Sequence, residues 1–378
     1  MSMEPPFTLG IEEEYLLVDL ATRDLANDPP HTLIEECIEL CGGQVSPEFL
    51  RSQIEVGTKV AKTVPTAKAD LKRLRKTVVD VARRHGLAPI AASTHPFART
   101  IMQKHTDKDR YVALAQEMQA AARRMLICGM HVHIGLADNE QRIDLMNQLS
   151  YFLPHFLSLS SSSPFWEGEQ TGFKSFRLTI FSALPRTGLP ERFASWGEYQ
   201  RHIDMLIKTG LIQDTTKIWW DLRPSWRYPT LETRIMDCCT SVEDSACLAA
   251  LVQSTLRMLY RLRSRNQQWR MYPAMLVTEN RWRAMRYGSD EGLLDLARGE
   301  LLPASQLLNE LLEMVHEDAE ALGCLTEVEH ARTILKRGTS AHRQVKVYED
   351  AKRRGASDRE ALIAVVDWLI KETASGLD

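Results

Sequence analysis

The chain has 378 residues, of which 44% are hydrophobic and 26% charged, with 47 Lys and Arg against 50 Asp and Glu. The formal charge of −3 excludes a polybasic nucleic-acid binder and a strongly acidic disordered chain. No apolar run approaches the ~18 residues of a membrane span, and the acidic N-terminus does not resemble a signal peptide. The cysteines are scattered along the chain, which favours reduced thiols over disulfides. We therefore expect a cytoplasmic protein without a membrane partner.

Strands and helices alternate in the first two-thirds of the chain. In chain order we expect a strand over 7–18, a helix over 31–41, a strand over 44–58, a helix over 64–85, a strand over 87–94, a helix over 106–124, a strand over 125–136 and a helix over 139–158. A loop-rich stretch over 160–172 and a strand pair within 216–237 follow, and the remainder is nearly all helical.

This order predicts an α+β fold, in which a curved, mostly antiparallel sheet forms a concave surface and is backed by helices. No linker is long or polar enough to force a boundary. We therefore expect a single catalytic domain over 1–378, sheet-rich over 1–240 and mostly helical over 241–378.

Four of the predicted strands carry polar side chains two positions apart, opposite an apolar face. Since residues i and i+2 of a strand share a face, each pair projects to the same side. The pairs are Glu12 and Glu14, Gln53 and Glu55, His131 and His133, and Glu232 and Arg234. The solvated outer face of a half-buried sheet gives the same alternation. None of these eight positions is a lysine, however, and the joint pattern favours a site.

The residue types in these pairs indicate metal chemistry. Neighbouring carboxylates repel each other unless a cation lies between them. Carboxylate oxygens joined by one or two imidazoles favour Mg²⁺ or Mn²⁺ over zinc.

Arginines are the second part of the pattern. They occur at Arg177, Arg223, Arg234, Arg281, Arg283 and Arg286. Guanidinium groups close to carboxylates and divalent cations suit a polyphosphate. The alternatives are a structural ion pair for Arg223 and Arg234, and a solvated helix face for the three between 281 and 286.

Motifs that are missing narrow the choice. The sequence contains no P-loop, no G-x-G-x-x-G and no G-x-S-x-G elbow. We interpret the serine run at 160–163 as a loop or helix end. Five tryptophans are interpreted as core packing, at Trp219, Trp220, Trp226, Trp269 and Trp282. A nucleotide would then be held by metals and arginines on a sheet.

Several motifs, taken together, resemble the carboxylate–amine ligase family, which is also called glutamate–cysteine ligase type 2 and is related to glutamine synthetase. In family order over residues 7–345 they are F-T-L-G-I-E-E-E-Y from Phe7, S-T-H-P-F from Ser93, G-M-H-V-H-I-G from Gly129, S-P-F-W-E-G from Ser163, W-D-L-R-P from Trp220, E-T-R from Glu232 and N-R-W-R-A-M-R-Y-G from Asn280. The resemblance implies a fold like the catalytic domain of glutamine synthetase, with the active site on the concave sheet, and a homodimer as a reasonable assembly.

The resemblance also implies roles for individual residues. Glu12, His131 and Glu232 would hold the metal nearest the transferred phosphate, and Glu14, Glu48 and Glu55 a second metal. His133, Arg223 and Arg234 would be catalytic and face the phosphates, Arg177, Asn280 and Arg286 would also contact the nucleotide, and Thr94, His95 and Gln53 would line the substrate pocket. Glu13 lies on the opposite face of its strand and should be structural.

The activity that the resemblance implies is ATP-dependent formation of an amide from a carboxylate, the γ-carboxylate of glutamate, and an amine, through an acyl phosphate and with Mg²⁺ or Mn²⁺. Weak glutamate–cysteine ligase activity is part of this expectation. Two alternatives stay open: a guanidino kinase-like phosphotransferase, and a non-catalytic regulator that binds ATP and metal. Pro229 stands where family members often have glycine, so the backbone approach to the ligand should differ there. The amine is not specified.

Overall fold

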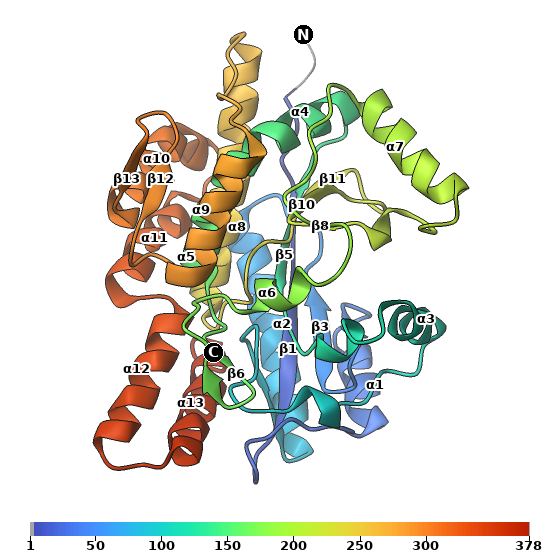
Figure 1. Cartoon of the computed structure of the whole chain (residues 1–378), viewed down its shortest axis with the longest axis vertical. Helices are drawn as coiled ribbons and strands as arrows, with labels where there is room; N and C mark the ends of the chain where they lie inside the picture. Colours follow the sequence, from blue (N-terminus) through green and yellow to red (C-terminus); the bar gives the residue numbers. More distant parts are fainter. Residues whose placement is uncertain (1–3, 378) are drawn as a thin grey trace.

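The computed structural model describes residues 4–377, and a seven-stranded sheet lies at its centre (Figure 1). The strand order is β10-β11-β5-β1-β3-β2, and β4 also pairs with β1. Every pairing in this sheet is antiparallel, which confirms the predicted fold class. Its strands are β1 (Leu9–Asp19), β2 (Val45–Pro47), β3 (Gln53–Gly57), β4 (Leu87–Ile90), β5 (Met130–Gly135), β10 (Leu222–Pro224) and β11 (Thr230–Thr233).

Helices cover the apolar side of this sheet. The long helices α2 and α8 pack on each other and on β1, with α2 behind β1 in Figure 1. The helices are α1 (His31–Leu40), α2 (Val64–Arg84), α3 (Asp109–Met118), α4 (Asn139–Leu149), α5 (Leu153–Ser160), α6 (Arg177–Phe181), α7 (Trp196–Lys208), α8 (Val242–Ser264), α9 (Ala274–Tyr287), α10 (Ala304–Ala321), α11 (Leu325–Arg337), α12 (Ser340–Arg353) and α13 (Asp358–Thr373).

Short strands complete the structure, in the pairs β6 (Phe165–Trp166) with β7 (Glu169–Gln170), β8 (Thr187–Gly188) with β9 (Trp219–Trp220), and β12 (Leu293–Asp295) with β13 (Glu300–Leu302). From residue 242 onward β12 and β13 are the only strands among the described residues, so the predicted helical end of the chain is confirmed. Within residues 4–377, no helix combines the length and the apolar character needed to cross a membrane.

Three predicted elements are interrupted in the structure. The strand predicted over 44–58 is two paired strands, β2 and β3, joined by a turn, and Pro47 lies at the sheet edge, where a missing amide donor is tolerated. The helix predicted over 139–158 divides into α4 and α5 around a short 3₁₀ turn, next to Pro154, whose ring blocks a helical hydrogen bond. The helix predicted over 106–124 divides into α3 and a 3₁₀ turn at Ala122–Arg124.

The prediction that all five tryptophans pack in the core is wrong for two of them. Trp219, Trp220 and Trp269 pack against the core. In contrast, Trp226 is 59% exposed and Trp282 is 44% exposed. Alternation and composition alone do not distinguish an aromatic residue in the core from one at the edge of a pocket.

Glu13 lies on the helix-covered side of β1, as predicted for a structural residue. Its carboxylate is fully buried and accepts hydrogen bonds from Arg75 Nη2 at 2.7 Å, Tyr15 Oη at 2.5 Å and Ser245 Oγ at 2.5 Å. Arg75 is also fully buried and donates to the carbonyl of Thr240 at 2.7 Å. The ion pair therefore joins the central strand to α2 and α8.

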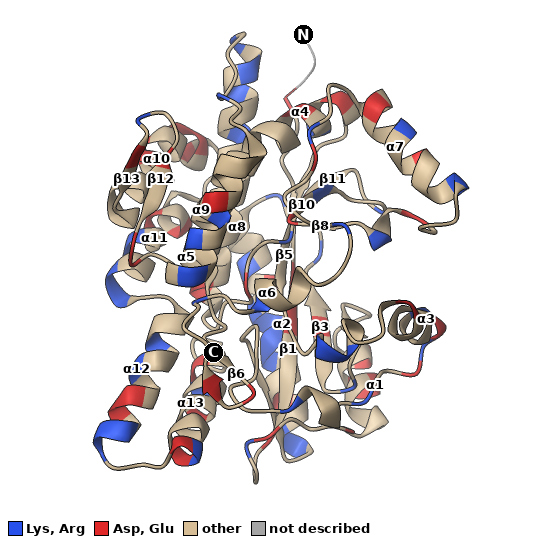
Figure 2. Ribbon diagram, in the orientation of Figure 1, with Lys and Arg blue, Asp and Glu red and all other residues tan. Residues whose placement is uncertain are grey.

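Charge is distributed differently on the outside and at the centre of the molecule. The outer helices α7, α12 and α13 carry both signs, whereas acidic residues lie along β1 at the centre of the view (Figure 2). Of these acids Glu13 faces α2 and α8, whereas Glu12 and Glu14 lie on the opposite side of the sheet.

Candidate active site

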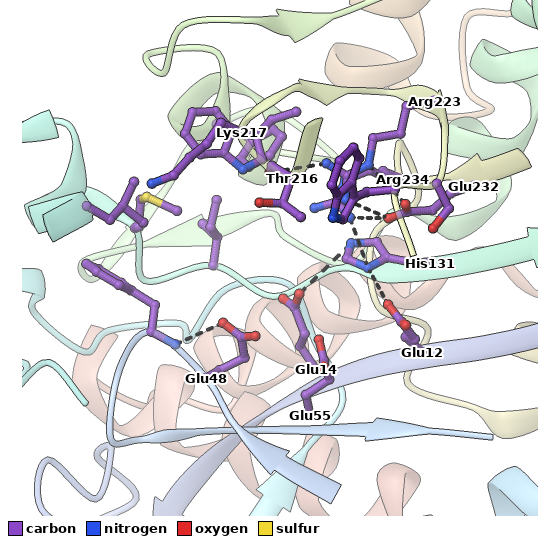
Figure 3. Close-up of a pocket in the computed structure, with 18 of the residues that line it drawn as sticks. Glu12, Glu14, Glu48, Glu55, His131, Thr216, Lys217, Arg223, Glu232 and Arg234 are labelled. Carbon is purple, nitrogen blue, oxygen red and sulfur yellow. Dashed lines mark hydrogen bonds and ion pairs between the residues drawn. The ribbon is translucent and has the colours of Figure 1, made fainter. Parts of the chain in front are cut away.

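The strand register brings the four predicted polar pairs together on one face of the sheet. Residues opposite each other in neighbouring antiparallel strands project to the same side. The opposed residues are Glu12 with His131, Glu14 with Glu55, and Glu232 with both His133 and Arg223. They line one pocket of about 400 Å³ (Figure 3).

Three residues of this face form a compact candidate metal site, which we call the Glu12 site. One ligand atom each from Glu12, His131 and Glu232 lies within 4.8 Å of the other two. Burial, together with the charge of Arg234, lowers the pKa of His131 to about 4, so the imidazole is neutral and able to ligate at neutral pH. Two carboxylates and one imidazole are a donor set that suits Mg²⁺ or Mn²⁺.

A second group of carboxylates, the acid cluster, consists of Glu14, Glu48 and Glu55. Glu48 comes from the turn between β2 and β3, and Figure 3 shows all three on the side of the pocket away from Arg234. Burial raises the pKa of each, and repulsion from Glu48 adds to the rise at Glu14 and Glu55. Among the described residues only the Glu12 site brings three ligand atoms within 4.8 Å of one another, so the second-metal role of the acid cluster stays a prediction.

The acid cluster predicts a pH effect on stability. Burial and Glu48 raise the pKa of Glu14 from 4.5 to about 7. The folded protein then binds a proton that the unfolded chain releases, so in the absence of divalent cations stability falls as pH rises from 4.5 to 7, by on the order of 3 kcal/mol from this group. Melting temperatures of the wild type and of Glu14→Gln between pH 4.5 and 8 measure this, and the variant should lack that share of the slope.

If the melting temperatures of the wild type and of Glu14→Gln changed equally with pH, the raised pKa of Glu14 would be contradicted. Mg²⁺ supplies the complementary measurement, because a cation that replaces the proton stabilises the wild type more at pH 8 than at pH 5.

Two arginines lie beside the Glu12 site. Arg223 Nε donates to Glu232 Oε2 at 2.9 Å, and Arg234 pairs with the other oxygen of the same carboxylate. Burial alone would raise the pKa of Glu232, but the charges of Arg234 and Arg223 hold it well below the usual range. Arg223 and Arg234 thus do form the structural ion pair that was considered as an alternative to phosphate binding. The buried Nε of Arg234, however, has no hydrogen-bond partner among the described residues. Such a donor suits an oxyanion.

His133 lies at the edge of the same group. Its Nε2 is 3.4 Å from Glu12 Oε1, and its Nδ1 is 3.0 Å from Thr230 Oγ1. Burial lowers the pKa of His133, but the neighbouring carboxylates of Glu12 and Glu232 outweigh burial and raise it from its usual value. His133 can therefore carry a proton close to where an anion would bind.

Arg177 lines the pocket and is held in place by backbone carbonyls and, through Asp237, by the serine-rich segment. The arginine donates to the carbonyls of Ile235 and Arg234, each at 3.2 Å, and its Nη1 lies 3.9 Å from Asp237 Oδ1. The buried Asp237 accepts hydrogen bonds from Ser163 Oγ at 2.7 Å and from the backbone nitrogen of residue 162 at 2.9 Å. The serine run thus begins at the end of α5 and anchors Asp237, in agreement with its interpretation as a loop or helix end.

Gly129 makes room for Arg177, and this gives a second prediction. A Cβ at Gly129 would lie 2.5 Å from Arg177 Nη2, so Gly129→Ala should displace the guanidinium and lower turnover by about 10²-fold. The matched control is Gly10→Ala on β1, where a Cβ meets nothing closer than 4.0 Å. Equal turnover of the two variants in an ADP-release assay would show that the position of Arg177 does not matter.

Thr94 and His95, predicted to line the substrate pocket, lie outside it. Neither lines the pocket. Thr94 Oγ1 donates to the carbonyl of Phe165 at 2.8 Å, while His95 Nε2 lies 3.0 Å from the carbonyl of Arg23 and its Nδ1 accepts from the amide of Ala98. Both side chains use their polar atoms to hold the loop after β4. Gln53 does line the pocket, although its amide is bonded to backbone.

Asn280 and Arg286 are also absent from the pocket lining, and their predicted contact with the nucleotide stays a prediction. Asn280 donates to the carbonyl of Leu294 at 2.8 Å and accepts from its amide at 2.7 Å, so it fastens α9 to β12. Arg286 bonds the carbonyl of Gly172. Arg281 is buried in an ion pair with the aspartate of the W-D-L-R-P motif, so a fully solvated helix face is wrong.

Sequence patterns missed much of the pocket wall. The missed residues come from α3, from the segment before β9 and from the β10–β11 turn, and they include Arg110, Tyr111, Leu114, Thr216, Lys217, Ser225, Trp226, Arg227 and Tyr228. None belongs to an alternating polar strand. A signal was available for the β10–β11 turn, because it lies between the R-P motif and the E-x-R motif, both of which were predicted to belong to the site.

Comparisons with known proteins agree with these motifs. The family model described as glutamate–cysteine ligase family 2 matches residues 8–367. A protein of Rhodospirillum rubrum, provisionally named glutamate–cysteine ligase 2, is 57% identical over 378 aligned residues, which cover 99% of this chain and 97% of that one. A protein of Paracoccus denitrificans with the same name is 52% identical over 372, with 98% and 99% covered.

Solved structures show the same fold at low identity. A glutamate–cysteine ligase from Francisella tularensis, in complex with AMP, is similar with a TM-score of 0.70 at 13% identity, over 99% of this chain and 90% of that one. A bifunctional glutathione synthetase from Pasteurella multocida gives 0.71 at 15% identity over 97% of this chain, which spans about half (52%) of that longer protein.

Proposed function

The chain belongs to glutamate–cysteine ligase family 2, and we propose on this basis that it joins the γ-carboxylate of glutamate to an amine, with ATP as phosphoryl donor. The observation that carries the proposal is the Glu12 site next to a buried arginine, Arg234, whose Nε lacks a partner among residues 4–377. We assign the activity to one catalytic domain that acts on small molecules.

In the first step a carboxylate oxygen of the substrate attacks the γ-phosphorus of ATP, and ADP leaves. Arg223 and Arg234 project from the sheet beside Glu232 and would bind the equatorial phosphate oxygens as charge builds up on them. A divalent cation held by the Glu12 site would supply Lewis-acid neutralisation of the same oxygens. The product of this step is an acyl phosphate.

In the second step the amine nitrogen attacks the acyl carbon, phosphate leaves with one oxygen of the original carboxylate, and the nitrogen loses a proton. The acid cluster lies on the other side of the pocket from the arginines and would face the amine (Figure 3). With the substrates bound in this way, the anion and the amine would lie on opposite sides of the reacting carboxylate.

The proposal is tested by following ADP and amide in mixtures of protein, ATP, Mg²⁺, glutamate and a panel of amines. We expect ADP release that depends on the amine and equals the amide formed. A phosphorylated product without amide would favour the phosphotransferase instead. Binding of ATP and Mg²⁺ without turnover across the panel would favour the regulator.

A further inference from the structure

The pocket has an apolar wall that neither ATP nor glutamate requires. Its residues come from the β2–β3 turn, α3, the segment before β5 and α6, and they are Phe49, Tyr111, Leu114, Met125, Ile127 and Phe181.

This wall is built directly onto the acid cluster. The amide of Phe49 donates to Glu48 Oε2 at 2.9 Å, and the ring of Phe49 contacts that of Tyr111 edge-to-face at 5.8 Å. On the other side the carbonyl of Ile127 accepts a hydrogen bond from Gln53 at 2.8 Å. If the amino group of an amino acid faces the acid cluster, the side chain of that amino acid is therefore close enough to contact these aromatic and aliphatic residues.

The other substrates are accounted for elsewhere in the pocket. Triphosphate is charged along its whole length and gains nothing from an apolar surface, and glutamate has only two methylene groups to place against one. The nucleoside has aromatic contacts available in the β10–β11 turn, which carries the exposed Trp226 and Tyr228 beside the strands of Arg223 and Arg234. The apolar wall is thus left for the amine.

Resting on the proposed ligase activity, we infer that the amine substrate is an α-amino acid with a bulky apolar side chain, of the size of leucine or phenylalanine. Its amino group faces the acid cluster, and its side chain packs on Leu114, Met125 and the neighbouring rings. Arg110, which lines the pocket from α3 with its guanidinium carbon 4.4 Å from the centroid of the Tyr111 ring, suits the carboxylate of the amino acid.

An amine panel tests this inference. Each methylene placed against an apolar wall changes kcat/KM by roughly 10-fold or more, so leucine or phenylalanine should exceed cysteine, serine and aspartate by at least about tenfold. A preference for cysteine or a polar amino acid would overturn the inference while leaving the ligase activity intact. No ADP release with any amine would instead count against the proposed function itself.

Variants locate the effect on the wall. Met125→Gln, which nearly conserves volume, and Leu114→Asn should each raise the KM for the apolar amine about tenfold and leave the KM for ATP unchanged. The matched control is Val112→Asn, on the same helix but 42% exposed and outside the pocket lining. Unchanged amine KM values in both wall variants, or an equal rise in the control, would overturn the inference; a melting temperature for each variant verifies folding.

Discussion

Replacing Glu232 with glutamine is expected to lower ADP release by about 10²–10³-fold while the chain stays folded. Glu232 contributes to the Glu12 site and at the same time holds Arg223 and Arg234, so its charge affects both the cation and the phosphate ligands. Glutamine keeps one oxygen that can accept from Arg223 Nε, at 2.9 Å in the present structure, and replaces the oxygen that pairs with Arg234 by an amide nitrogen, which cannot accept. The variant therefore loses both the charge and the Arg234 pairing, and the thermal melt verifies that it is folded.

The measurement is kcat for ADP release at saturating ATP and amine, together with a thermal melt. Glu300→Gln, an exposed acid on β13, is the control and should turn over like the wild type. Full turnover by Glu232→Gln would show that the pocket described above is not where phosphate is transferred.

Replacing Glu13 with alanine should act on stability instead, by about 3–5 kcal/mol. The change leaves Arg75, which is fully buried, without its carboxylate, and also removes the acceptor of the Tyr15 hydroxyl. Denaturant unfolding measures the loss. Since Glu13 faces the helices, the protein that remains folded should keep its kcat.

A second variant separates the ion pair from simple loss of volume. If the penalty comes from the unpaired guanidinium, Glu13→Ala combined with Arg75→Met should be less destabilised than the sum of the two single variants. Additive losses, or a loss below about 1 kcal/mol for Glu13→Ala, would contradict a buried ion pair. Adjacent residues of β1 would thus be shown to act separately, Glu12 in chemistry and Glu13 in stability.

The faces of the strands were predictable from the sequence because alternation has a period of two. Glu12 and Glu14 could be assigned to one face and Glu13 to the other without any structure. The register was not predictable in this way, since nothing local states that Glu12 lies opposite His131. The ordered family motifs supplied that information, and the strand pairing agrees with it.

Membership of a motif did not predict which polar side chains lie in the pocket. Thr94, His95 and Asn280 belong to the recognised motifs, yet their polar atoms are bonded to nearby backbone, and sequence does not show how a side chain's hydrogen bonds are used. The opposite error concerns Trp226, which was interpreted as core but lines the pocket at a turn. Pocket walls made of loops and helix ends carry no periodic signal.

The central claim, that a carboxylate is activated by phosphorylation and then captured by an amine, is tested most directly with glutamate labelled with ¹⁸O in its γ-carboxylate. The reaction is run with ATP, Mg²⁺ and the best amine of the panel, and the phosphate released is examined by mass spectrometry. The proposal predicts one ¹⁸O atom in the phosphate for each amide formed. Unlabelled phosphate, or labelled glutamate recovered without amide while ATP is consumed, would contradict it.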